Sequence, residues 1–166
     1  RQDCLSTTRW AEFYTTQRVL PFAVKAHRRG NLDGEGLIAV KRACDALLVE
    51  DEDAPLARLH GDLWAGNLLF STAGPRFIDP AAHGGHPLTD IAMLELFGAP
   101  HLSEIVEGYL TAGGELGRDW EARIPIHQLH PLAVHAYTHG PSYGSALVRV
   151  AEDCLLYTSP SPRDAT

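Results

Sequence analysis

The sequence is most constrained between His60 and Asp79, where a polar loop precedes two short apolar segments. The loop reads HGDLWAGN and leads into residues 68–70 (LLF), a turn at 71–75 and residues 76–78 (RFI). Two short apolar segments joined by residues rich in Ser, Thr, Gly and Pro predict a β-hairpin. Such a hairpin returns the chain, so we expect Asp79 to lie near the end of the polar loop.

Three polar residues of this stretch have the layout of a phosphoryl-transfer site. Asp62 stands within the loop, Asn67 ends it, and Asp79 follows the hairpin. The same order occurs in the catalytic and metal-binding loops of protein kinases. In that layout Asp62 orients the acceptor hydroxyl and takes its proton, while Asn67 and Asp79 bind Mg²⁺. One amide and one carboxylate suit magnesium, which completes its shell with phosphate oxygens and water.

The surrounding residues resemble the fructosamine kinase (ketosamine kinase) family, within the aminoglycoside phosphotransferase-like, protein-kinase-like superfamily. The matching motifs are LHGDLWAGNLLF, FIDPAAHGGH and DIAMLELFG, with weaker similarity over the whole of 9–150. The Gly of HGD is typical of small-molecule kinases, and Trp64 and the DPA motif with its following GH separate this family from aminoglycoside and choline kinases. The resemblance implies ATP-dependent phosphorylation of a sugar hydroxyl in fructosamine- or ribulosamine-type ketosamines, with Mg²⁺, in protein deglycation or repair.

The resemblance also implies a role for individual residues. Asp62 corresponds to the catalytic base, Asn67 and Asp79 correspond to the metal ligands, and Asp90 braces the loop through backbone contacts. The other candidates are a loop-bracing residue, which is His60, and three substrate contacts, which are Trp64, His83 and His86. For Trp64, stacking on a sugar and burial against the helix expected at 37–49 stay equally open.

The expected fold is mainly α with a small β-hairpin, the C-terminal lobe of a protein-kinase-like fold. The 59 residues before His60 contain no Gly-rich phosphate loop and no lysine–glutamate pair, so we expect the N-terminal lobe to be absent from this chain and the chain alone to be inactive. Residues 1–154 are expected to form the lobe fragment. The Ser- and Pro-rich residues 155–166 predict a non-native, disordered tail.

Periodicity predicts six helices. Pro21 is expected to break or kink the first of them, and Pro125 and Pro131 the fifth. The expected ranges are 9–26, 37–49, 90–97, 101–111, 120–139 and 143–156.

Composition excludes several classes of protein. Of the 166 residues, 45% are hydrophobic and 21% charged, the balance of a globular domain. A net charge of −7 disfavours nucleic acid as a partner. No apolar run predicts a membrane span, no secretory leader is visible, and three scattered cysteines indicate reduced thiols, so we expect a cytoplasmic protein with a small-molecule partner. The oligomeric state stays open.

Some observations favour other interpretations. The family usually has a Glu near position 88, where this chain reads PLTD around Leu88. An aminoglycoside or amino-alcohol phosphotransferase remains an alternative, as does a catalytically inactive truncated lobe. A metal site formed by His127, His130, His135 and His139 is disfavoured because no HExxH-type spacing is present. A metal hydrolase using His83 and His86 is disfavoured because the glycines between them predict a loop that passes close to substrate.

Overall fold

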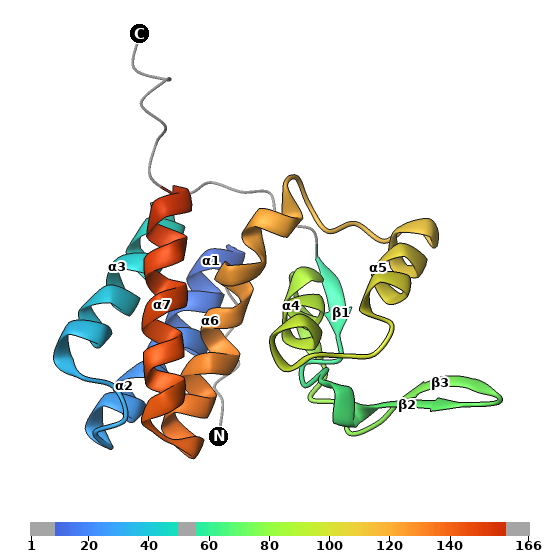
Figure 1. Cartoon of the computed structure of the whole chain (residues 1–166). Coiled ribbons are helices and arrows are strands. Elements are labelled where there is room, and N and C mark those ends of the chain that lie inside the picture. The colour runs from blue at the N-terminus through green and yellow to red at the C-terminus, as the bar shows by residue number, and fades with distance from the viewer. Residues whose placement is uncertain (1–8, 50–55, 159–166) are drawn as a thin grey trace, which may run out of the picture. The chain divides into compact units, whose positions relative to one another are not determined.

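A computed structural model describes residues 9–49 and 56–158. The described chain is mostly helical and contains two small antiparallel sheets, which confirms the expected mainly α composition with a β-hairpin (Figure 1). Its contacts divide it into two compact units, Arg1–Glu52 with Leu129–Thr166, and Asp53–Gln128. Within the described ranges, no helix combines the length and apolar character needed to cross a membrane.

The first unit opens with one uninterrupted helical run from Trp10 to Arg28. Its parts are α1 (Trp10–Phe13), a π-helical segment η1 (Tyr14–Val19) and α2 (Leu20–Arg28). The run is therefore not broken at Pro21, and the kink expected as the alternative stays a prediction. Pro21 lies in the first turn of α2, directly after the π-helical segment. A π turn shifts the backbone hydrogen-bond register, which accommodates a residue that has no N–H to donate.

The predicted second helix is confirmed and begins three residues earlier than expected. It is α3 (Gly34–Val49), and it packs along α7 (Pro141–Thr158) within the first unit (Figure 1). Both helices bury apolar side chains, including Val40 of α3 and Leu147 of α7, and the side chain of Val148 on α7 lies against Gly36 of α3. Of the expected tail, residues 155–158 belong to helix α7, with Leu156 79% exposed, and 159–166 lie outside the described residues.

Helix α6 (Trp120–His139) runs through both of its prolines without a break, and the kink expected as the alternative stays a prediction. Pro125 and Pro131 each remove one backbone hydrogen bond. The helix nevertheless buries apolar side chains before, between and after them, including Ile124, Leu129 and Ala136. Burial of this apolar surface offsets the lost hydrogen bonds.

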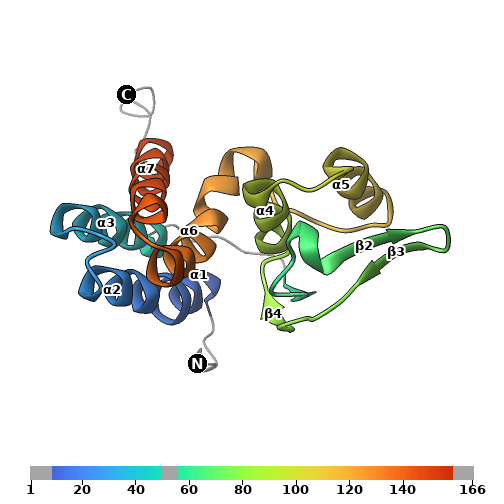
Figure 2. The same ribbon diagram turned by 60° about the horizontal axis from the view of Figure 1, so that its bottom comes forward.

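The second unit contains two short sheets, whose first strands come directly before and after the polar loop in the chain (Figure 2). The predicted hairpin is confirmed as β2 (Leu68–Ser71) paired with β3 (Gly74–Phe77), and its turn is tighter than expected because Ser71 pairs with Gly74. The other sheet pairs β1 (Ala57–Leu59) with β4 (His83–Gly85). The loop expected around Gly84 and Gly85 is therefore wrong for residues 83–85, because two adjacent glycines indicate a turn only when they are read locally.

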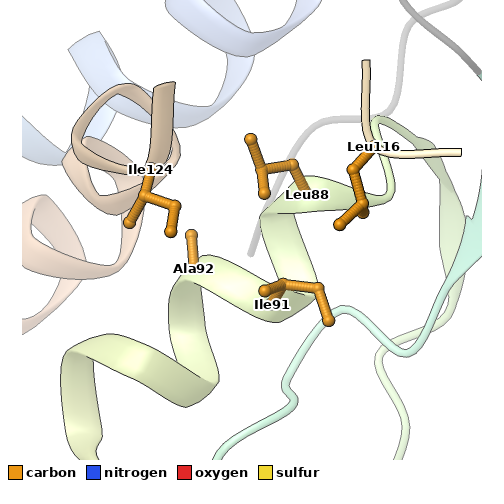
Figure 3. Packing of buried hydrophobic residues seen from close by; sticks show 5 residues of the cluster. All are labelled: Leu88, Ile91, Ala92, Leu116 and Ile124. Atoms are coloured by element: carbon orange, nitrogen blue, oxygen red, sulfur yellow. The ribbon is translucent and has the colours of Figure 1, made fainter. Parts of the chain in front are cut away.

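Helices α4 (Leu88–Phe97) and α5 (Leu102–Thr111) complete the second unit. Helix α4 is buried on two sides. One side packs against the chain near the start of α6, and Figure 3 shows the cluster, which comprises Leu88, Ile91, Ala92, Leu116 and Ile124. The other side contributes Leu94, which packs with Leu63 within the polar loop and with Leu68 directly after it. Helix α4 therefore anchors the loop to the core of the unit.

Candidate functional site

The carboxylate of Asp90 holds the start of the polar loop. It accepts the backbone N–H of His60 at 2.7 Å and that of Gly61 at 3.0 Å, one on each oxygen. These are the hydrogen bonds expected for this residue. Burial raises the pKa of Asp90, and the two backbone donors oppose that shift by favouring the carboxylate. Asp90 thus fixes the loop backbone, with one donor held by each of its oxygens.

His60 ties the loop to the end of the hairpin. Its Nε2–H donates to the carbonyl of Ile78 at 2.8 Å, and its Nδ1 accepts the backbone N–H of Asp62 at 3.3 Å. The carbonyl can only accept, so this pair of contacts selects the Nε2–H tautomer. Both ring nitrogens are engaged within the loop, which fits a bracing function better than proton transfer.

Asn67 and Asp62 are joined across the loop. The side-chain Nδ2 of Asn67 donates to the carbonyl oxygen of Asp62 at 2.9 Å and to its carboxylate Oδ2 at 3.3 Å. Asn67 is only 7% exposed, so its orientation is fixed by these contacts and by packing. Because its nitrogen faces Asp62, its amide oxygen is left to accept from another group or to bind a cation.

The hairpin brings Asp79 next to the end of the loop. The N–H of Ile78 donates to the carbonyl of Asn67 at 3.1 Å, which extends the pairing of Leu68 with Phe77 by one step. Asp79 follows directly, is exposed, and has a left-handed backbone with φ of 51°. This conformation is strained for most residues but is tolerated by Asp, and it turns the chain away from β3 at this residue.

The donors at this end of the hairpin fit a magnesium ion that shares its shell with phosphate. Asn67 offers an amide oxygen and Asp79 a carboxylate, a pair of hard oxygen ligands. Within 9–49 and 56–158, no group of three or more His, Cys, Asp or Glu is arranged to hold a metal ion. These described residues therefore do not form the all-protein cage typical of zinc.

Two glycines allow the loop to pack closely, a requirement that the sequence analysis missed. At Gly61, where φ is 81°, an added Cβ would collide with the Ala81 carbonyl and lie 2.8 Å from Nδ1 of His83. At Gly66 it would collide with the indole of Trp64. In the sequence, the glycines of HGD and AGN were the only indication of these two close contacts.

The candidate substrate contacts fall into different environments. Trp64 is 45% exposed, so full burial, one of the two alternatives left open for it, is not observed, and its indole covers the backbone at Gly66. His83 lies beside Gly61, and its Nδ1–H donates to the Ala81 carbonyl at 3.0 Å. Both rings border the loop from its accessible side.

His86 is placed where it does not reach solvent. It is 1% exposed, its ring centroid lies 4.6 Å from that of His127, and its Nδ1 accepts the N–H of Leu88 at 3.1 Å. Burial and, to a smaller extent, the charge of Arg123 together lower the pKa of His86 to about 4. This placement gives no support to a substrate contact at His86. Leu88 is likewise fully buried, so the position near which the family has a Glu is a core position here.

Comparisons with known proteins agree with this geometry. The sequence model of the fructosamine kinase family matches residues 2–157. A "Probable ketoamine kinase" of Lactiplantibacillus plantarum is 33% identical over 147 residues, which are 86% of this chain and 51% of the relative. The "Ketosamine-3-kinase" of Mus musculus is 30% identical over 83% of this chain and 45% of its own length.

A solved structure has the same fold. The chain described as a "putative fructosamine-3-kinase" from Thermobifida fusca YX-ER1 superposes with a TM-score of 0.87 at 44% identity, over 93% of this chain and 54% of that one. This chain spans about half the length of the curated relatives it matches. The family match extends over nearly all of its residues and includes every residue of the candidate site, and the chain therefore belongs to the fructosamine kinase family.

Proposed function

We propose that this chain is the acceptor- and metal-binding part of an ATP-dependent kinase that phosphorylates a sugar hydroxyl of a ketosamine. The observation that carries the proposal is the arrangement at the hairpin, where Asn67 is bonded to Asp62 on one side and lies one pairing step from Asp79 on the other. A base and two metal ligands so linked suit phosphoryl transfer, in which catalysis consists mainly of positioning and charge stabilisation.

Asp62 is the proposed general base. Its carboxylate orients the acceptor hydroxyl, whose oxygen attacks the γ-phosphorus of ATP as the bond from that phosphorus to the β-phosphate oxygen breaks. The hydroxyl proton passes to Asp62 and ADP leaves. The Asn67 amide, which donates to Asp62 Oδ2, holds that carboxylate in one orientation. Proton acceptance of this kind contributes about 10²–10⁴-fold to the rate.

Asn67 and Asp79 are the proposed magnesium ligands. Magnesium, when bound, neutralises charge on the phosphate oxygens and orients them for in-line transfer. The Asn67 amide oxygen and the Asp79 carboxylate hold the metal side of the site. The hairpin fixes the spacing of these two residues through the Ile78 to Asn67 hydrogen bond.

Trp64 and His83 are the proposed contacts to the sugar of the substrate. The indole is half exposed beside the base-bearing loop, and its apolar face suits the C–H face of a sugar ring. The Nε2 of His83 is an acceptor in the tautomer that donates from Nδ1, and it suits a sugar hydroxyl.

We propose that another segment of a longer protein, the N-terminal lobe, binds the nucleotide. No Gly-rich phosphate loop stands in the 59 residues before His60. Several apolar side chains on and near the hairpin are exposed and available to such a segment: Trp64 45%, Leu69 47%, Phe70 47% and Phe77 61%. Without that segment the chain supplies the acceptor and metal side only, and we expect it to lack the ordinary kinase rate of about 1–100 per second.

The test compares this chain with a version extended to the length of its relatives. Each is incubated with ATP, Mg²⁺ and a fructosamine or ribulosamine, and ADP release is measured. We expect turnover only in the extended protein, and a fall of about 10²–10⁴-fold in Asp62→Asn. The matched control is Asp45→Asn, an exposed aspartate of α3, which should keep the full rate.

Two results would contradict the proposal. Turnover of the unextended chain at an ordinary kinase rate would show that no further nucleotide-binding segment is needed. An extended enzyme that ignores ketosamines and phosphorylates aminoglycosides would leave the site assignment intact but overturn the substrate class.

A further inference from the structure

A cavity of about 520 Å³ lies among α4, α5 and the start of α6, within the second unit. Apolar side chains form much of its wall. Ile91 comes from α4, Leu102, Val106 and Leu110 come from α5, and Trp120 begins α6. Val106 and Trp120 also pack against the core cluster of Figure 3, so the inner wall is part of the folded core. A cavity of this size and lining suits an apolar group of a small molecule.

The same cavity has an acidic rim. Glu95, Glu107 and Glu121, one from each of the three helices, line it and are exposed. No lysine, arginine or histidine lines it, and across the described part of the chain none of these three glutamates forms an ion pair. On the same α5 helix, by contrast, Glu104 faces His101 at 3.7 Å. The rim therefore presents negative charge that the protein itself does not neutralise.

Trp120 adds a second preference for positive charge. An indole face attracts a cation more strongly than any other aromatic side chain does. A ligand that satisfies both features carries an ammonium group for the rim and an apolar ring or chain for the wall. The volume corresponds to a small molecule rather than to a large interface.

We propose that this acidic-rimmed cavity binds a small amphipathic amine, an ammonium group attached to an apolar ring or alkyl chain. The cavity shares no residue with the loop and hairpin of the proposed kinase site. Binding here needs neither nucleotide nor metal. The inference therefore stands or fails independently of the proposed function.

The experiment titrates this 166-residue chain, labelled with ¹⁵N, with three probes of similar size. They are 2-phenylethylammonium, uncharged 2-phenylethanol and anionic 3-phenylpropionate. We expect the ammonium probe to shift amide signals of α5 and the indole N–H of Trp120, which is assigned with Trp120→Phe. Exposed ion pairs are individually weak, so we expect a preference of roughly tenfold for the amine over the alcohol, lost at high salt.

Two matched variants on α5 separate a specific rim from general surface charge. Glu107→Gln should weaken amine binding about two- to fivefold and leave the alcohol unchanged. Glu104→Gln removes the same charge from a side chain that does not line the cavity and should leave all three affinities unchanged. Leu110→Ala trims a 42% exposed wall residue and should weaken the amine and the alcohol alike.

Several outcomes would overturn the proposal. They are an amine that binds no tighter than the alcohol, equal effects of Glu107→Gln and Glu104→Gln, shifts centred on the loop at 60–67 instead of on α5, and the absence of binding by any probe. Circular dichroism and urea unfolding of each variant establish that the fold is retained, so a lost affinity reports on the cavity.

Discussion

Replacing Asp90 with asparagine tests how α4 holds the polar loop. In the parent protein the two carboxylate oxygens accept the N–H groups of His60 and Gly61 at 2.7 and 3.0 Å. Asparagine keeps one acceptor and turns an amide N–H₂ toward the other donor, so one hydrogen bond to a charged group is lost, worth about 1.5–3 kcal/mol. Burial of the charge, which raises the pKa of Asp90, is relieved at the same time and offsets part of that loss.

The net expectation is that the loop opens more easily by about 1–2 kcal/mol, which is a 5- to 30-fold faster amide exchange at His60 and Gly61. Hydrogen exchange followed by NMR measures both amides directly. Glu95→Gln, an exposed change on the same helix, should leave them unaltered. If Asp90→Asn is folded and both amides exchange within twofold of the parent rate, the carboxylate does not hold the loop and the reasoning is refuted.

Three further predictions follow from burial and backbone geometry. The pKa of His86 is about 4 in the folded protein and 6.5 in the unfolded chain, so as the pH falls the unfolded chain is protonated first. The free energy of unfolding should therefore be constant with respect to His86 above pH 6.5 and should fall by up to about 3 kcal/mol between pH 6.5 and pH 4. In urea unfolding at pH 7, 5 and 4, His86→Gln should flatten this decline and the exposed His139→Gln should not. Burial raises the pKa of Cys44 to about 12 from 9.0, so iodoacetamide at pH 8 should alkylate it about 1000-fold more slowly in the native protein than in urea, and equal rates would contradict its burial. Gly61→Ala, at φ of 81° and against a carbonyl, should lower the free energy of unfolding by at least about 1–2 kcal/mol, whereas Gly84→Ala, with open space around it, should change it by no more than about 0.5 kcal/mol, and equal losses would remove the close-packing argument.

The elements that the sequence predicted well are those specified by local patterns. The helical period around Val40 and Leu47 is enough to place α3, and the turn composition at 71–75 is enough to place the hairpin. Strand β4 was missed because its pairing partner, β1, lies more than twenty residues away, and its Gly84-Gly85 pair indicates a loop when it is read alone. Non-local pairing leaves no local signal of that kind.

Interpretations that depended on burial were less successful. The prolines of the first helix and of α6 were expected to break or kink them, and no break occurs, because a π turn and apolar burial keep both runs helical. His86 was expected beside substrate because two glycines precede it. Its burial depends on α6, which brings His127 against it from about forty residues away.

The candidate site itself was largely accessible from the sequence. The order of Asp62, Asn67 and Asp79 is local, and the hairpin that connects them is short. The Asp90 contact came from the family resemblance, since nothing in the local pattern links α4 to the loop backbone. Hydrogen bonds within the loop, such as that from Asn67 to the Asp62 carbonyl, became visible only in three dimensions.

The most direct test of the central claim replaces Mg²⁺ with paramagnetic Mn²⁺ in the ¹⁵N-labelled protein extended to the length of its relatives, in the presence of ATP. If Asn67 and Asp79 hold the metal, the amide signals of residues 67, 78 and 79 should broaden first and most strongly. Asp79→Asn should weaken that broadening, because it removes the one carboxylate of the pair. Broadening centred instead on the acidic rim at Glu95 and Glu107, or unchanged in Asp79→Asn, would contradict a phosphoryl-transfer site at this hairpin.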